Sequence, residues 1–372
     1  MSKVKLGDVA IEHKETCGGS KDGYPIVGLE HLTPEEVTLT AWDEDSDNTF
    51  TKVFRKGNVL FGRRRAYLRK AAVAPFDGIC SGDITVIEAI PDRILPELLP
   101  FIIQNDGLFS FAVGKSAGSL SPRVKWEHLK NYEFELPSMD RQRELAELLW
   151  AMDTTKKSYQ KLIAATDELV KSQFIEMFGR TETVTSNLSA WPSYEIRELY
   201  DVKSSKRIYA KELTTSGIPF LKVGDVLERI NTGESHPTVF ISEQKYCELK
   251  ESGLVPKAGD ILVTSRGTIG KCYILADDDA FYFQDGMISW LKAKCDCRLL
   301  PEFTAALFAE EGFLKTLDEV TNKTTVTYIS LDKLAGLKVI CPPEEKQREY
   351  LDFLRQSDKS KYLIANILDQ YK

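Results

Sequence analysis

The chain has 372 residues, of which 42% are hydrophobic and 28% charged, and its formal net charge is −7 at pH 7. These values are typical of a soluble globular protein with room for two or three domains. They argue against a basic nucleic-acid coat, although DNA binding needs only a locally basic face. We find no apolar run long enough to cross a bilayer, so we expect no membrane span.

Cysteine and histidine usage bears on the compartment and on metals. The seven cysteines are scattered and odd in number, which favours reduced thiols in the cytoplasm over a disulfide framework. Residues 1–5 lack the apolar region of a signal peptide, so we expect a cytoplasmic protein. The four histidines are far apart, and Cys295 and Cys297 stand alone as a close pair, so the sequence predicts no metal site.

The first part of the chain, to about residue 137, has the pattern of one mixed domain of helices and strands. Turn residues followed by apolar runs predict strands at 23–29, 57–62 and 78–87. The segment 96–111 is predicted to be helical after its prolines.

Charge is segregated along this domain. Residues 30–47 carry seven acids and no lysine or arginine, whereas 52–70 carry eight lysines and arginines and no acid. Such a block can be an ordinary solvated surface, or it can hold phosphates and guanine edges, since arginine binds guanine with two hydrogen bonds. The strand at 57–62 brings three arginines to its end, and a polar loop of small residues follows at 115–121. The candidate DNA-binding residues of this domain are Arg63, Arg64, Arg65, Lys70, Lys115, Ser116 and Ser119.

A long helix is predicted from Asp140 to Phe178. Proline and glycine are absent from it, and Gly179 provides a stop. Apolar residues recur at alternating steps of four and three, which is the pattern of a coiled coil, and the helix would be about 57 Å long. The predicted seam contains Leu145, Leu149, Met152, Tyr159, Ile163 and Val170.

The frame of the first domain then recurs after a polar linker at 180–190. Residues 194–199 correspond to 4–9, and 217–223 correspond to 23–29. Residues 259–267 correspond to 57–65, and 322–327 correspond to 116–121. Taken alone, these segments would be ordinary turns, but the repeat predicts a second set of DNA contacts. Its candidates are Thr264, Ser265, Arg266, Lys271, Thr324 and Thr325.

A second, shorter helix is predicted from Glu345 to the end of the chain. It repeats the first helix at an offset of 205 residues, and its seam contains Tyr350, Leu354, Ile364 and Leu368. The segment Arg141–Glu144 recurs as Lys346–Glu349. Each helix could pack only on its own domain, but the equal seams favour two helices of one duplicated unit, packed together as a spacer. The predicted domains are 1–139, 140–179, 180–343 and 344–372.

Motifs for self-contained catalysis are missing from the sequence. We find no phosphate-binding loop, no dinucleotide fingerprint, no zinc-protease motif and no nucleophile elbow. The N-P-P-[YF] tetrapeptide of amino-methyltransferases is also missing. Glu12-His13-Lys14 could be taken for part of a nuclease site, but it lacks an upstream aspartate pair at a suitable distance. The sequence therefore predicts a protein that is not itself an enzyme.

The order of these elements, found twice, resembles the specificity subunit of type I restriction-modification systems. The resemblance is carried by 4–9 with 194–199, by 57–65 with 259–271, and by 136–144 with 341–349, each of the last pair leading into a long helix. It implies two α/β target-recognition domains in an α+β chain. Two antiparallel helices would form a coiled-coil spacer between them, with a pseudo-two-fold repeat.

The resemblance also implies partners. Each domain would read one half of a bipartite asymmetric site in double-stranded DNA. The subunit would recruit two methyltransferase subunits that methylate adenine, and translocase-nuclease subunits that cut unmodified DNA. S-adenosylmethionine, ATP and Mg would be bound by those partners, and this chain would bind no cofactor. The second helix is about 11 residues shorter than the first, and the sequence leaves open what this does to the pairing.

Two other interpretations remain open from the sequence. The chain could be the specificity subunit of a system in which one partner chain carries both modification and cleavage. It could also be a coiled-coil scaffold with two protein-binding modules, which the acidic segment 30–47 slightly favours. Charge reversal at Arg64 and Arg266 separates the scaffold from the DNA-binding interpretations.

Overall fold

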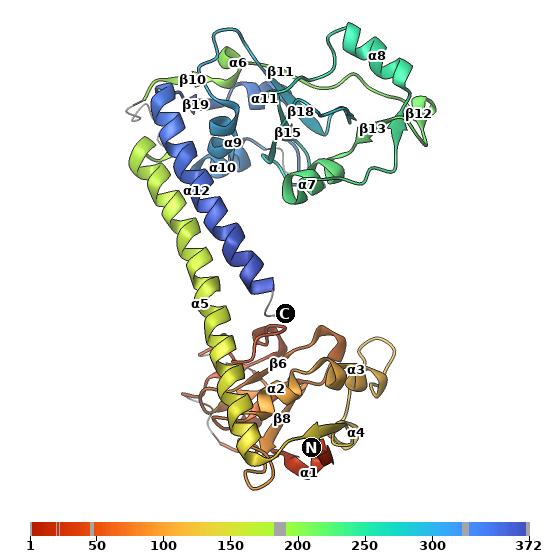
Figure 1. Ribbon diagram of the computed structural model, residues 1–372, viewed down its shortest axis with the longest axis vertical. Coiled ribbons are helices and arrows are strands. Elements are labelled where there is room, and N and C mark those ends of the chain that lie inside the picture. Colours follow the sequence, from red (N-terminus) through yellow and green to blue (C-terminus); the bar gives the residue numbers. More distant parts are fainter. Residues whose placement is uncertain are drawn as a thin grey trace. The chain divides into compact units, whose positions relative to one another are not determined.

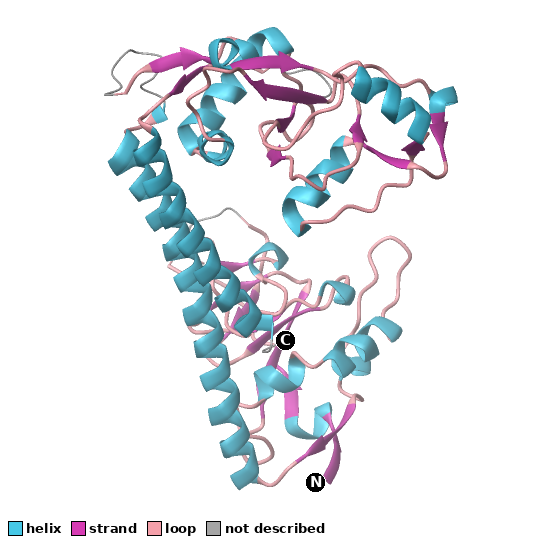
Figure 2. Cartoon of the chain, turned by 45° about the horizontal axis from the view of Figure 1, so that its top comes forward, coloured by secondary structure: helices cyan, strands magenta, loops and turns pink. Residues whose placement is uncertain are grey.

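The computed structural model describes residues 2–19, 21, 23–44, 48–181, 191–321 and 327–369 (Figure 1). They form two compact units, the first ending at Gln160 and the second beginning at Lys161. The long helix α5 (Met139–Phe178) contributes its N-terminal half to the first unit and its C-terminal half to the second. Both units mix helices and strands (Figure 2), which confirms the expected mixed fold with an internal repeat.

The described residues of the first unit form three small sheets. The largest is antiparallel, in the order β2 (Ala10–Glu12), β8 (Ile84–Ala89), β5 (Val59–Gly62), β6 (Ala71–Val73). A second has the order β3 (Ile26–Val27), β7 (Gly78–Cys80), β4 (Lys52–Phe54). The third pairs β1 (Ser2–Lys5) with β9 (Glu133–Leu136), so the beginning and end of the domain are hydrogen-bonded neighbours.

Short helices and α5 cover the sheets of the first unit. The helices are α1 (Leu6–Val9), α2 (Leu99–Ile103), α3 (Asp106–Gly114) and α4 (Trp126–Leu129), with 3-10 turns at Leu29–His31 and Ala66–Leu68. The segment predicted as one helix at 96–111 is two, because the side chain of Asn105 accepts a hydrogen bond from Gly107 N and starts α3 anew. Leu145 and Leu149 of α5 pack on the core around Phe61, Leu99 and Leu108.

The second unit repeats this plan. Its main sheet has the order β11 (Tyr200–Lys203), β18 (Ile288–Ala293), β15 (Ile261–Thr264), β16 (Cys272–Ile274). Its second sheet has the order β12 (Leu213–Thr214), β14 (Phe240–Ile241), β13 (Ile218–Leu221), β17 (Tyr282–Phe283). Again a two-stranded ladder closes the domain, between β10 (Ser193–Glu195) and β19 (Lys338–Ile340). The parallel pair β13 and β17 corresponds to the parallel pair β3 and β7.

More helices are described in the second unit than in the first. Those of the second unit are α6 (Ile196–Leu199), α7 (Val223–Thr232), α8 (Glu243–Glu251), α9 (Pro301–Ala309), α10 (Glu311–Val320), α11 (Leu331–Ala335) and α12 (Glu344–Asp369), with a 3-10 turn at Ala210–Glu212. Inserted helices α7 and α8 have no counterpart among the helices described in the first unit. The frames of the two units therefore match while their middles differ.

The C-terminal half of α5 lies against α12 within the second unit (Figure 1). Tyr350 packs edge-to-face on Phe174 and Phe178, with ring centroids 5.3 and 5.7 Å apart. Further along, Lys361 Nζ lies 2.9 Å from Asp167 Oδ1. Later residues of α12 thus contact earlier residues of α5, so the two helices are antiparallel.

The predicted seam divides between two cores. Leu145 and Leu149 pack on the first domain, whereas Val170, Tyr350 and Leu354 belong to the core of the second. The prediction of one continuous helix-helix seam is therefore wrong for Leu145 and Leu149. A heptad pattern marks an apolar face, and a globular domain can cover that face as well as a helix can.

A buried glutamine fixes the start of each long helix. Gln142 Oε1 accepts a hydrogen bond from Leu95 N at 2.8 Å, and its amide donates to Pro137 O at 3.0 Å. Gln347 does the same with Leu300 N and Pro342 O, at 2.9 and 2.8 Å. Both glutamines are almost completely buried. The same side chain therefore attaches each helix to its own domain at the same place.

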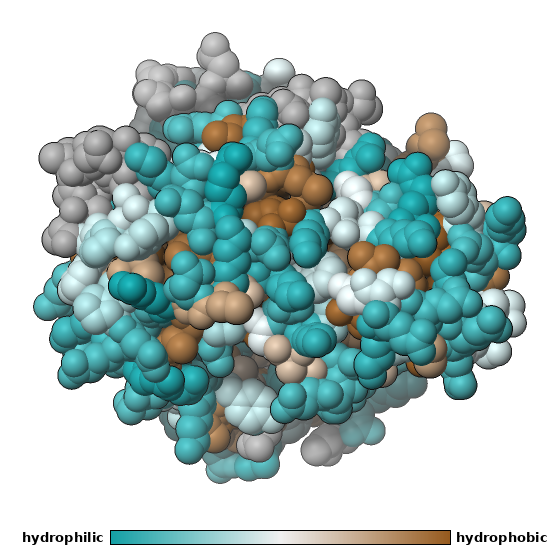
Figure 3. Space-filling view, turned by 90° about the horizontal axis from the view of Figure 1, so that it is seen from above, coloured by the Kyte–Doolittle hydropathy of each residue, from teal (hydrophilic) through white to brown (hydrophobic). Residues whose placement is uncertain are grey.

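Hydrophilic residues dominate the face drawn in Figure 3, and hydrophobic residues form small separate areas on it. Among the described residues, none of the helices is both long and apolar enough to span a bilayer.

Candidate nucleic-acid interface

In the first unit, the end of strand β5 meets the polar loop that precedes α4. Arg65 N donates to Pro122 O at 2.8 Å, and Val124 N donates to Arg63 O at 3.0 Å. Ala117 and Arg123 exchange two further hydrogen bonds, which close the loop on itself. Two candidate segments that are about 50 residues apart in the sequence thus form one edge.

The second unit contains the same junction. Gly267 N donates to Thr327 O, and Ile329 N donates to Ser265 O, both at 3.0 Å. The bridge between Arg64 and Arg123 has its counterpart between Arg266 and Tyr328. The sequence repeat therefore corresponds to a structural repeat of the edge. Thr324 and Thr325 lie outside the described residues.

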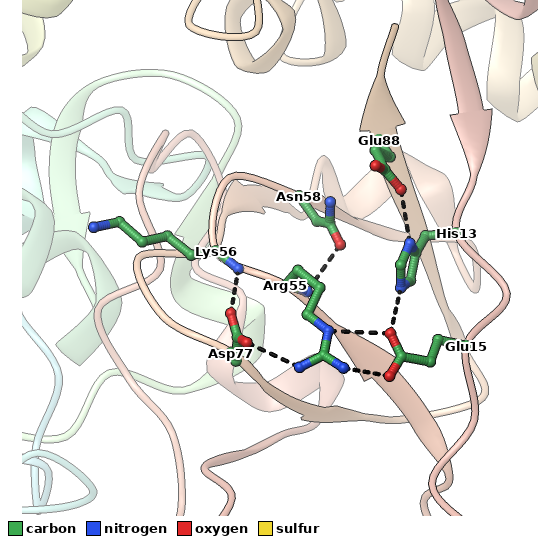
Figure 4. A network of polar contacts seen from close by, with 7 residues as sticks. All are labelled: His13, Glu15, Arg55, Lys56, Asn58, Asp77 and Glu88. Carbon is green, nitrogen blue, oxygen red and sulfur yellow. Dashed lines mark hydrogen bonds and ion pairs between the residues drawn. The ribbon is translucent and has the colours of Figure 1, made fainter.

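Arg55, Arg64 and Arg69 of the basic block at 52–70 form ion pairs with acids from other segments. Figure 4 shows Arg55 held between Glu15 and Asp77, with Nη1 2.9 Å from Asp77 Oδ2. The hydrogen bonds from Arg55 lower the pKa of Glu15. His13 continues the network to Glu88 at 2.7 Å. Segregation of charge along the sequence is therefore not segregation in space.

Other members of the block are also occupied. Lys52 Nζ donates to Ile84 O and Lys70 Nζ to Leu29 O, both at 2.7 Å. Arg69 forms an ion pair with Asp106. Among the described residues, the side chains of this block that form no ion pair are Lys52, Lys56, Arg63, Arg65 and Lys70, and of these Lys52 and Lys70 are held by backbone carbonyls. The local charge at the edge therefore depends on few side chains.

Asp83 binds two arginines at this edge. It receives Nε and Nη2 of Arg123 at 2.7 and 3.1 Å, and Nη1 of Arg64 lies 3.5 Å from it. Ser121 Oγ accepts from Arg64 Nη2 at 3.0 Å. Hydrogen bonds from Arg123, followed by the charges of Arg123, Arg64 and Arg63, lower the pKa of Asp83. The cluster of Arg64, Asp83 and Arg123 carries one net positive charge and stays partly exposed.

Arg63 and Arg65 differ from Arg64 in their settings. Arg63 Nε is buried and has no hydrogen-bond partner within the described residues. Arg65 is exposed and has a left-handed backbone with φ of 53°. A residue other than glycine rarely adopts this conformation, and such strain is often retained at functional sites.

Two predicted contacts of the second unit are buried. Thr264 is fully buried and accepts a hydrogen bond from Lys271 N, and Ser265 bonds to Ser289 Oγ at 2.6 Å. Their hydroxyls complete the interior of the strand end, so the prediction that they contact DNA is wrong for this conformation. Arg266 and Lys271 are exposed and remain candidates.

The loop at 115–121 exposes a mixed set of side chains. Lys115 and Ser119 are exposed, whereas Ser116 Oγ donates to Ala112 O at 2.8 Å and is half-buried. Leu120 is 90% exposed, which sequence analysis had overlooked. Its signal is a single leucine between serines in a loop otherwise free of large apolar side chains.

Sequence analysis also missed Asp83, Arg123 and Tyr328. Asp83 follows Gly82 in a turn, and Arg123 follows Pro122, so neither stands in a basic block. The repeat offers the signal, since Arg123 and Tyr328 occupy one position in the two copies. Among the described residues, no three histidine, cysteine or acidic side chains are placed to hold a metal ion.

Comparison with known proteins decides the family. Residues 1–165 and 189–371 match the sequence model of the type I restriction modification DNA specificity domain. The chain belongs to this family. Its two matched segments correspond to the two copies of the frame described above.

Curated relatives of this family are distant in sequence. The specificity subunit of the type I restriction enzyme MjaVIII from Methanocaldococcus jannaschii is 26% identical over 67% of this chain and 60% of its own length. A Haemophilus influenzae relative is 29% identical over 47% of this chain and 41% of its own length. The chain thus spans about two fifths to three fifths of the curated relatives it matches.

Solved structures resemble the whole chain in fold. One is a chain from a study of complex assembly and conformational transition of the type I R-M system, with a TM-score of 0.62 and 19% identity over 100% of this chain and 94% of that one. Another is the type I restriction-modification S subunit from M. genitalium, with a TM-score of 0.56 and 12% identity over 100% and 92%. At these identities the likeness concerns the fold alone.

Proposed function

We propose that the chain is the DNA sequence-specificity subunit of a type I restriction-modification complex. Each unit reads one half of a bipartite asymmetric site in double-stranded DNA. The observation that carries this proposal is the repeated edge, where Arg64 and Arg266 occupy one backbone position in two frames of the same family. Side chains at such an edge can reach base edges in a groove, which is how proteins read sequence directly.

Together, α5 and α12 serve as the spacer between the two readers. Their antiparallel contacts, Tyr350 on Phe174 and Lys361 on Asp167, support this role. Because two related half-sites on a duplex must be met at a fixed distance, a stiff helix pair suits the task.

The chain is a recognition subunit without catalysis of its own, and its partners act in the cytoplasm. Two methyltransferase subunits bind S-adenosylmethionine and methylate adenine, and translocase-nuclease subunits use ATP and Mg to cut unmodified DNA. The family supports these partners. The subunit itself binds no cofactor.

In vitro selection from a random duplex library tests the proposal. The full-length chain, alone and produced with the methyltransferase subunit of its system, should enrich a motif in two separated parts. Binding should weaken steeply as salt rises, because phosphate contacts release counterions. Equal affinity for all sequences would contradict the proposal.

Charge reversal separates DNA recognition from a scaffold. Arg64→Glu should weaken preference in one half of the motif and Arg266→Glu in the other. If both variants bind the selected duplex like the unmodified chain, a scaffold with two protein-binding modules becomes the better explanation.

A further inference from the structure

We propose that Asp83 holds the guanidinium groups of Arg64 and Arg123 in place to bind a guanine in the major groove. This cluster would then determine the base preference of the half-site read by the first unit. The inference rests on the proposed DNA-reading function and adds which side chains give it its specificity and for which base.

The geometry of Arg123 is that of a preset planar donor. Two parallel hydrogen bonds to Asp83, at 2.7 and 3.1 Å, fix the plane of its guanidinium. Arginine has five N–H donors, so the outer ones remain available to a ligand. The side chains of Arg64 and Arg123 are 38% and 41% exposed, whereas Asp83 beneath them is 21% exposed.

Such fixing favours a base over a phosphate. Arginine can also bind a phosphate with two hydrogen bonds, but a point charge is enough for a phosphate contact, whereas guanine O6 and N7 require two donors in one plane. Fixing the side chain in advance also removes rotamer entropy that binding would otherwise lose. The carboxylate leaves the cluster one net positive charge, enough to attract an acceptor edge.

The second unit has the same backbone edge with different side chains, as expected if it prefers a different base. Backbone hydrogen bonds place Met287 where the first unit has Asp83, because Ser265 N donates to Met287 O as Arg63 N donates to Asp83 O. Tyr328 takes the position of Arg123, and Arg266 that of Arg64. The backbone edge is kept while its side chains change from arginine and aspartate to tyrosine and methionine. Two domains that bind different DNA sequences need such a shared backbone with different side chains.

Selection with variants of the full-length chain tests the inference. Asp83→Asn and Arg123→Lys are compared with the unmodified chain by sequencing the enriched duplexes. The motif of the unmodified chain should contain a guanine in one half. Both variants should reduce preference for that guanine about tenfold, the size of one two-bonded base contact, and leave the other half unchanged. Arg266→Lys identifies the half read by the second unit.

A matched control uses another arginine of the first unit. Arg55 is also 41% exposed and bound to carboxylates, but it lies in the Glu15 and Asp77 network (Figure 4). Arg55→Met should leave both halves of the motif unchanged. Arg123→Lys keeps the charge at a partly exposed position, so it tests the inference even if Asp83→Asn folds poorly.

The outcomes separate the inference from the function. If the unmodified chain enriches no sequence, the proposed function fails. If it enriches a bipartite motif that Asp83→Asn and Arg123→Lys both preserve, only this inference fails. If Arg123→Lys weakens all duplexes by the same factor and keeps the guanine preference, Arg123 contacts phosphate and the inference is overturned.

Discussion

Arg65 and Arg69 adopt left-handed backbone conformations, with φ of 53° and 54°. Gly267 and Gly270 stand at the corresponding places in the second unit, with φ of 76° and 85°. Glycine takes this conformation without steric cost, whereas a side chain with a β-carbon costs about 1 kcal/mol or more. The first unit therefore keeps two arginines where glycine would carry no strain, and of these Arg69 is held by its ion pair with Asp106 while Arg65 is a candidate DNA contact.

Replacing Arg65 should separate stability from binding. Arg65→Gly should be more stable than Arg65→Ala by about 1 kcal/mol, because both remove the guanidinium and only alanine keeps the strain. Urea denaturation measures the difference. Both variants should lose DNA affinity equally, and an alanine variant as stable as the glycine variant would contradict the strain.

The pKa of Asp83 predicts a dependence of stability on pH. Because its pKa is lowered in the folded chain from an ordinary 3.8, the ionised form contributes stability above that value. This contribution disappears as the pH falls through the lower, folded pKa. The stability advantage of the unmodified chain over Asp83→Asn should thus be constant down to about pH 5 and shrink below about pH 4.

Urea denaturation at a series of pH values checks this expectation. Asp92→Asn, at an exposed position of the same unit, serves as the control for general acid effects. A difference between the unmodified chain and Asp83→Asn that grows toward acid pH would show that the sign is wrong.

The sequence predicts those parts of the site whose residues recur in the repeat, and it does not predict contacts between segments that are far apart in the sequence. The two segments that form the edge were predicted because both recur in order. The ion pairs were not, since Glu15, Asp77, Asp83 and Asp106 come from segments outside the basic block. Burial of Thr264 was missed because the sequence does not show where strand β15 ends.

At the scale of elements, Gln142 and Gln347 attach the long helices to their domains. Each side chain satisfies one backbone donor and at least one backbone acceptor that have left water. The two copies of the segment that contains these glutamines are recognisable in the sequence as part of the repeat. The anchoring role of the glutamines cannot be predicted from the sequence, because their partners Leu95 and Leu300 are 47 residues away.

Removing either glutamine should destabilise its own unit. We expect Gln142→Ala and Gln347→Ala each to cost about 1–3 kcal/mol, since buried backbone groups lose their partners. Gln160→Ala, at an exposed position of α5, should change stability by less than about 0.5 kcal/mol. Thermal unfolding measures the loss, and hydrogen exchange assigns it to a unit. Similar effects at all three positions would contradict the anchoring role.

The long helices themselves were well predicted. Residues 140–178 and 345–372 compare with Met139–Phe178 and Glu344–Asp369. Uninterrupted apolar periodicity indicates the length of a helix and which of its faces is apolar. It does not say what covers that face, which is why Leu145 and Leu149 were assigned to a helix partner.

At the scale of the whole molecule, the proposed spacer makes the gap between half-sites a property of helix length. Seven residues inserted after Gln160 and seven after Ala365 should lengthen both helices by about 10 Å and keep their apolar faces in phase. In vitro selection should then return half-sites about three base pairs further apart.

A control insertion tests whether the helices set this gap. Seven residues added in the predicted linker 180–190 should leave the preferred gap unchanged. If lengthening the helices also leaves it unchanged, α5 and α12 do not measure the distance between the readers.

The closing ladders β1 with β9 and β10 with β19 have a consequence for how such a protein can change. Ser2 pairs with Leu136 and Ser193 with Ile340, so each domain begins and ends at one place on the frame. A single contiguous exchange of coding sequence could therefore replace one reader and leave the other intact. A small set of interchangeable domains, combined in pairs, would then give many different DNA target sequences.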